Sequence, residues 1–147
     1  MQKLMLLMVL GFHIGYAQSI DYNTKKGYVA QGYDVVTYFE NMALEGNSEY
    51  QTIYDGVKYK FSSKDHLNTF LEHPENYIPQ YGGYCAYAIA DKGKKVGANP
   101  ETFEIRDGKL YLFYNAWGTN TLELWLKEDV KALQKKADEN WEAIKQH

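Results

Sequence analysis

Cysteine is almost absent from this 147-residue chain, which contains only Cys85. A single thiol excludes an internal disulfide. In an exported chain it is then buried, bound to a metal, bridged to a second chain, or reactive. Methionine is also scarce: beyond the first eight residues only Met42 remains, which argues against a methionine-rich copper carrier.

Basic residues are not in excess either, with 16 Lys and Arg against 19 Asp and Glu and a net charge of −3. The absence of a basic cluster excludes the electrostatic footprint of a nucleic-acid-binding protein. After residue 17 no apolar run approaches the roughly 20 residues that span a bilayer, so we expect no membrane span in the mature chain. We find no internal repeat and no linker in the sequence, and therefore expect one domain over residues 18–147.

The first 17 residues have the pattern of a secretory signal peptide. Lys3 gives a basic start, Leu4–Ile14 is an apolar run, and Gly15-Tyr16-Ala17 resembles a cleavage site. The sequence predicts cleavage near Ala17, a mature chain of 147 − 17 = 130 residues, and a periplasmic or secreted location.

Two Asp-Gly pairs, at 55–56 and 107–108, each stand between runs in which apolar and polar residues alternate. Asp-Gly in this setting is a strong signal for a β-hairpin, because the favoured turn needs positive φ angles. We expect both hairpins to lie in one small antiparallel sheet.

Helical periodicity follows each predicted hairpin. A serine cap at 62–63 predicts a helix to about Glu72, and apolar residues at steps of three and four predict an amphipathic helix over Asp129–Ile144. The expected buried faces are Leu67, Phe70 and Leu71 for the first helix, Leu122, Trp125 and Leu126 for a helix over Thr119–Lys127, and Val130, Leu133, Ala137, Trp141 and Ile144 for the last. The predicted class is α+β, with helices packed on the sheet.

Around Cys85 the sequence reads Tyr-Gly-Gly-Tyr-Cys-Ala-Tyr from residue 81. The tyrosines recur every three residues, as on one helix face, and the glycine pair predicts a bend with a short helix opening near Tyr84. Cys85 is either a soft-metal or ligand-binding thiol among phenols, or a small buried residue in an aromatic core.

Several segments together resemble the YHS domain family, in its exported bacterial branch. They are GYDVVTYF (32–39), YKFSS (59–63), FLEHPENY (70–77), YGGYCA (81–86), DGKLYL (107–112) and ADENW (137–141). The resemblance implies a small α+β domain and an association with heavy metals, because related domains sit on copper-transporting pumps. In metal-handling relatives cysteines stand where this chain has Thr37, Ser62 and His66.

The residues leave three functions open, beside a purely structural or interaction role. Cys85 and His66 offer thiolate and imidazole, ligands that suit Cu(I) or Zn(II), and a second copy of the chain could complete such a site as a homodimer. The alternative is a non-metal binding module for a small molecule. The third is a thiol enzyme in which His66 would act as the base for the Cys85 thiol. We commit no residue to a catalytic role. The ligand-binding candidates for the tyrosine-lined pocket of the second function are Tyr33, Asp34, Tyr59, Tyr81 and Tyr84.

Overall fold

The computed structural model describes residues 18–146; the predicted signal peptide, Met1–Ala17, and His147 lie outside them. The α-helices are α1 (Lys64–Glu72), α2 (Ala86–Lys92), α3 (Thr121–Lys127) and α4 (Val130–Ile144). The strands are β1 (Thr24–Lys25), β2 (Tyr28–Val29), β3 (Asn47–Tyr54), β4 (Val57–Phe61), β5 (Asn99–Arg106), β6 (Lys109–Phe113), β7 (Asn115–Ala116) and β8 (Thr119–Asn120). Short turns of tighter helix are η1 (Ala30–Gly32), η2 (Thr37–Glu40), η3 (Pro74–Asn76) and η4 (Gln80–Gly83). Within residues 18–146 no helix has the length and apolarity that crossing a bilayer requires.

The α+β class is confirmed, and both Asp-Gly pairs form the predicted turns with positive φ angles. The two hairpins, however, do not share one sheet. Strands β1, β2, β4 and β3 form one sheet in that order, whereas β5–β6 and β7–β8 are separate two-stranded sheets. Strand β2 pairs in parallel with β4, so the first hairpin is extended by the segment that precedes it in the chain and not by the second hairpin.

The two large hairpins are built to one pattern. Asn47 pairs with Phe61 ahead of a bulge in β3, and Asn99 pairs with Phe113 ahead of a bulge in β5. Each residue of the second pair stands 52 positions after its counterpart in the first pair. Each asparagine side chain accepts a hydrogen bond from the backbone amide two residues further on, at 2.9 Å in both cases. Bulges are specific features of a strand rather than defects. Their repetition with the same register indicates that one structural unit occurs twice.

The segments that lead into the hairpins repeat as well. Residues 30–32 have left-handed φ angles of 49°, 54° and 86°, and residues 81–83 have angles of 55°, 61° and 80°. A tyrosine follows in each case. The backbone amides of the next residues, Asp34 and Cys85, then donate hydrogen bonds of 2.8 and 2.9 Å to the loop that leads into the hairpin.

A short parallel contact completes the pattern: Tyr28 pairs with Lys58 on β4, and Pro79 pairs with Leu110 on β6. We call residues 28–77 the first unit and residues 79–144 the second unit. The expectation that the chain has no repeat is therefore corrected. The repetition lies in backbone geometry, and equivalent side chains such as Lys58 and Leu110 differ too much in chemistry to reveal it.

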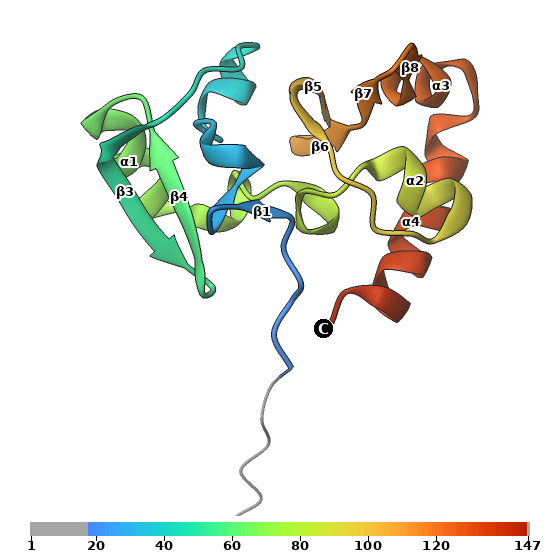
Figure 1. Ribbon diagram of the computed structural model, residues 1–147, viewed down its shortest axis with the longest axis horizontal. Coiled ribbons are helices and arrows are strands. Elements are labelled where there is room, and N and C mark those ends of the chain that lie inside the picture. The colour runs from blue at the N-terminus through green and yellow to red at the C-terminus, as the bar shows by residue number, and fades with distance from the viewer. Residues whose placement is uncertain (1–17, 147) are drawn as a thin grey trace, which may run out of the picture.

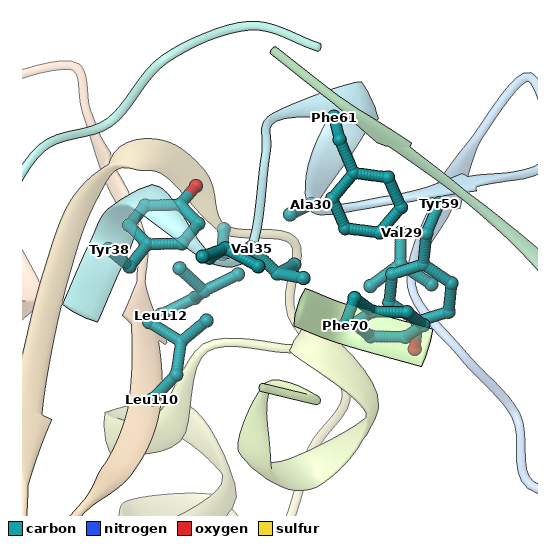
Figure 2. Close-up of a cluster of buried hydrophobic side chains, with 11 residues drawn as sticks. Val29, Ala30, Val35, Tyr38, Tyr59, Phe61, Phe70, Leu110 and Leu112 are labelled. Atoms are coloured by element: carbon teal, nitrogen blue, oxygen red, sulfur yellow. The ribbon is translucent and has the colours of Figure 1, made fainter. Parts of the chain in front are cut away.

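The buried hydrophobic side chains form two clusters, and the first of them joins the two units. In the first, Leu110 and Leu112 of β6 pack with Val35 and Tyr38 of the first unit, so this core spans both units (Figure 2). The second cluster lies within the second unit, where Trp125 of α3 and Leu133 of α4 cover β6 and α2. Figure 1 accordingly shows the β3–β4 hairpin and α1 on one side and α2, α3 and α4 on the other.

Side-chain caps begin the helices as the sequence predicts. Ser63 accepts from the His66 amide at the start of α1, and Asp129 accepts from the Ala132 amide at the start of α4. Two predicted core residues are not in the core, because Leu71 and Leu126 are each 53% exposed. Each of them follows a fully buried residue, Phe70 or Trp125, and one step along a helix rotates a side chain by about 100°, here away from the core.

Candidate functional site

Asp34 is the centre of a buried polar cluster in the first unit. Its side chain is fully buried and accepts four hydrogen bonds. The donors are the Val36 amide at 2.9 Å, the Ser62 amide at 2.8 Å, the Ser62 hydroxyl at 2.7 Å and His66 Nδ1 at 2.7 Å. Four donors around one carboxylate satisfy the hydrogen-bonding capacity of this buried group. Asp34 therefore links η2 to the start of α1, and its carboxylate is used by hydrogen bonds within the chain.

His66 is oriented by this carboxylate. Because Nδ1 donates to Asp34, the other ring nitrogen, Nε2, points outward, 3.4 Å from a carboxylate oxygen of Glu40. Burial lowers the pKa of His66, but the hydrogen bond and charge of Asp34 and the charge of Glu40 outweigh burial and raise it. The imidazolium form is thus stabilised between two carboxylates.

Cys85 lies elsewhere and has a different partner. Its side chain is fully buried, and its sulfur lies 3.2 Å from the hydroxyl of Thr121 at the start of α3. It occupies the place in the second unit that Asp34 occupies in the first. Among residues 18–146, no three side chains of His, Cys, Asp or Glu are placed to hold a metal ion together. The structure therefore gives the two predicted metal ligands separate surroundings, and a metal held by both stays a prediction.

The predicted pocket tyrosines do not converge on one cavity, although Tyr81 and Tyr84 both pack on the ring of Trp141. Tyr33 donates to Glu101 at 3.4 Å, Tyr81 to Asp138 at 2.9 Å and Tyr84 to Asp21 at 3.2 Å. Tyr59 is buried in the first core cluster, and its hydroxyl has no hydrogen-bond partner in the described part of the chain. Tyr81 is not on a helix face with Tyr84, because its φ angle is 55° and α2 begins only at residue 86. Tyr81 instead lines a cavity of about 360 Å³ between η4 and α4.

The larger cavity, of about 590 Å³, lies where the two units meet. Of the predicted ligand-binding residues only Tyr33 lines it. One wall comes from segments that precede the first hairpin, and the other from the loop before β5 and from the chain around β7. The lining residues are Lys25, Gln31, Tyr33, Glu45, Val96, Gly97, Ala98, Asn99, Pro100, Tyr114, Asn115 and Ala116.

This cavity offers donors, acceptors and both signs of charge. Lys25 and Glu45 enter no ion pair in the part of the chain that the structure describes, which leaves an ammonium and a carboxylate for a ligand. Gln31 donates to the carbonyl of Ala98 at 3.0 Å and so links the two walls. Its own φ angle of 54° is uncommon for a residue with a side chain, and such backbone strain clusters at functional sites.

A family model for the YHS domain matches residues 35–81 of this chain. The chain carries a YHS domain. No curated protein and no solved structure matches the chain. The YHS match covers most of the first unit and ends at Tyr81, so the second unit is a structural counterpart that lies beyond it.

Sequence reasoning missed most of the cavity because its lining residues, apart from Glu45, lie outside the YHS match. Gln31, Asn99 and Asn115 stand in loops or at strand ends, where no periodic pattern selects them. One signal was available: Asn99 and Asn47 precede the two hairpins at the same distance from their Asp-Gly turns.

Proposed function

We propose that this YHS protein is a binding protein that holds a small polar ligand in the cavity between its two units. The observation that carries the proposal is the cavity itself, whose volume of about 590 Å³ falls in the range of small-molecule sites, roughly 300–1,000 Å³. Its amides, its phenols and the Lys25 and Glu45 charges would fix a ligand that both donates and accepts hydrogen bonds. This is the non-metal binding module of the sequence analysis, with a different set of residues.

Gly97 gives a direct test, because a Cβ built there meets no atom within 4 Å and its φ angle is not left-handed. Gly97→Phe should fill the cavity without disturbing the fold. Leu71→Phe, at a 53% exposed position on α1, is the matched control. The wild type and each variant are titrated by NMR with a panel of amino acids, nucleosides and mono- to trisaccharides. Ligand concentrations reach about 10 mM, ten times a Kd of about 1 mM, so that binding as weak as about −4 kcal/mol is detected.

We expect at least one compound to shift the backbone amide signals of Gly97 and Asn99 in the wild type and in Leu71→Phe. The same compound should leave Gly97→Phe unchanged. The proposal fails if no compound of the panel binds the wild type, or if Gly97→Phe binds as tightly as the wild type.

Soft-metal handling through Cys85 and His66 is the second candidate, and the copper association of YHS domains is its background. One observation favours His66 as a ligand: a histidine that binds a metal usually donates its other ring N–H to a carboxylate, as His66 does to Asp34. Anaerobic titration with Cu(I) tests this candidate. Binding should be lost in both Cys85→Ser and His66→Ala, and loss in the cysteine variant alone would indicate a thiol site shared between two chains.

For both candidate functions we propose that the protein acts in the periplasm or outside the cell, because residues Met1–Ala17 resemble a signal peptide. N-terminal sequencing of the protein recovered from the periplasm and the medium tests this location. A chain that begins near Gln18 is expected, and one that still begins with Met1 would contradict it.

A further inference from the structure

The two units differ most clearly in one insertion. In the first unit the cap of α1, Ser63, follows Phe61 by two residues, whereas in the second unit the cap of α3, Asn120, follows the equivalent Phe113 by seven. The additional residues form the small β7–β8 hairpin. Since α1 begins without such a hairpin and with the same kind of side-chain cap, the insertion is not needed to start the helix.

The insertion instead serves the cavity. Tyr114, Asn115 and Ala116 all line it. The base of the insertion is fixed, because the backbone amide and the hydroxyl of Thr121 both donate to the carbonyl of Tyr114, at 2.9 and 2.8 Å. The wall that these residues form is therefore held in place from both ends of the small hairpin.

Trp117 is the residue after Ala116 and stands at the turn of this hairpin. Its side chain is 96% exposed, and its φ angle is 53°. A bulky residue at a left-handed φ is a conformational outlier, and the cost of such strain is accepted mainly at functional positions. Asparagine or glycine would suit the turn better. Neither folding nor burial accounts for a tryptophan there, so a contact outside the folded chain is the remaining role.

The chemistry on the two sides of Ala116 identifies a class of ligand. The cavity is lined by Gln31, Asn99 and Asn115, whose side-chain amides also donate hydrogen bonds within the fold, and by the charged Lys25 and Glu45. Trp117, the residue after Ala116, adds a flat indole that is 96% exposed. A pyranose ring fits both, because its hydroxyl groups donate and accept hydrogen bonds while its C–H face packs on an aromatic ring. An anionic ligand is less suited, since Glu45 and an overall charge of −3 oppose it.

We propose that the cavity binds a neutral carbohydrate and that Trp117 stacks on one of its sugar rings. This inference rests on the proposed binding function and narrows it to one ligand class. Trp117 is then the specificity-determining residue, carried on a hairpin that the second unit has added to the common plan.

The probes are the trisaccharides of glucose in β-1,4 and α-1,4 linkage, of N-acetylglucosamine and of mannose, titrated separately into the full chain and followed by NMR. The chain has three tryptophans, and the indole N–H of Trp125, which donates to Glu104, is an internal control. We expect one probe to shift the Trp117 indole signal and leave that of Trp125 in place. Its Kd should weaken at least tenfold in Trp117→Ala and be unchanged in Leu126→Ala, an exposed apolar control on α3.

A second variant separates binding from a structural role. Trp117→Asn suits the left-handed φ angle, so its unfolding midpoint should equal or exceed that of the wild type while sugar binding weakens as in Trp117→Ala. A fall in the midpoint of Trp117→Asn with sugar binding retained would assign Trp117 to the fold and overturn the inference.

The remaining outcomes distinguish this inference from the function on which it rests. If a trisaccharide binds equally in Trp117→Ala but not in Gly97→Phe, the stacking role is wrong and the cavity function stands. If an amino acid or a nucleoside binds and no trisaccharide does, the carbohydrate class is wrong and the cavity function again stands. Binding that Gly97→Phe leaves intact would overturn both.

Discussion

Replacing Asp34 by alanine should destabilise the protein strongly, because four donors converge on its carboxylate. The Ser62 hydroxyl and the His66 ring are partly exposed and can turn to water, but the backbone amides of Val36 and Ser62 cannot move. A buried donor without a partner costs about 1–3 kcal/mol. Breaking a buried ion pair costs about 3–5 kcal/mol. We therefore expect Asp34→Ala to lower the free energy of unfolding by about 3–5 kcal/mol.

Cys85→Ala is the matched control, because Cys85 holds the equivalent place in the second unit. The polar contact of its side chain joins the sulfur to the Thr121 hydroxyl at 3.2 Å, and removing this contact leaves no backbone donor without a partner. Deleting one buried heavy atom costs about 1 kcal/mol. The same position in the two units should thus differ several-fold in its contribution.

Urea unfolding followed by tryptophan fluorescence measures both variants, with the free energy taken from a two-state fit. NMR titration supplies a second readout: without Asp34, burial acts on His66 unopposed by its nearest carboxylate, so the pKa of His66 should fall relative to the wild type. Equal losses in the two variants, or an unchanged His66 titration in Asp34→Ala, would refute the assignment of Asp34 as the anchor of the first unit.

Three further outcomes are expected. Wild type should be more stable than His66→Asn by a constant amount below about pH 6.5, and this advantage should be lost as the pH rises through the raised pKa of folded His66. The reason is that the folded state binds the His66 proton more tightly than the unfolded state does, and urea unfolding at several pH values measures the difference. Tyr59→Phe should leave the free energy of unfolding unchanged or raise it by about 1 kcal/mol, since it removes a buried hydroxyl that has no partner in residues 18–146. A decrease of more than about 1 kcal/mol would show that the hydroxyl does have a partner. Trp141→Ala should cost about 3 kcal/mol in thermal or urea unfolding, because its ring packs on the rings of Tyr81 and Tyr84 at centroid distances of 6.3 Å; a cost below about 1 kcal/mol would make α4 a loose appendage.

Local signals in the sequence predicted the local structure well. Both Asp-Gly turns, the Ser63 cap of α1 and the amphipathic α4 are where short-range chemistry placed them. The association of the elements was harder to predict. Nothing in the hairpin sequences indicates that β2 would pair in parallel with β4, or that the second hairpin would form a separate sheet.

The candidate site could be predicted only in part, for a related reason. Tyr33 was identified from its motif and lines the cavity. Asp34 comes from the same motif, but its carboxylate is buried and accepts four hydrogen bonds from within the chain. The spacing of tyrosines around Cys85 suggested one helix face, but residues 81–83 have left-handed φ angles, so no helix runs through Tyr81 and Tyr84. The two hydroxyls therefore donate to different carboxylates, those of Asp138 and Asp21. Periodicity assumes regular backbone, and it fails where the backbone is strained.

The cavity lies where the two units differ in sequence and length. Glu45 and Gly97 hold the same place before their hairpins, 52 positions apart, and both face the cavity. Were the units identical, a second glutamate would stand at position 97, and two carboxylates would then line one small space. Glycine there leaves room for a ligand, and the β7–β8 insertion adds a wall that the first unit cannot provide. The first unit has kept the family motif and a rigid polar anchor at Asp34, while the changes that make a binding site possible lie in the second unit.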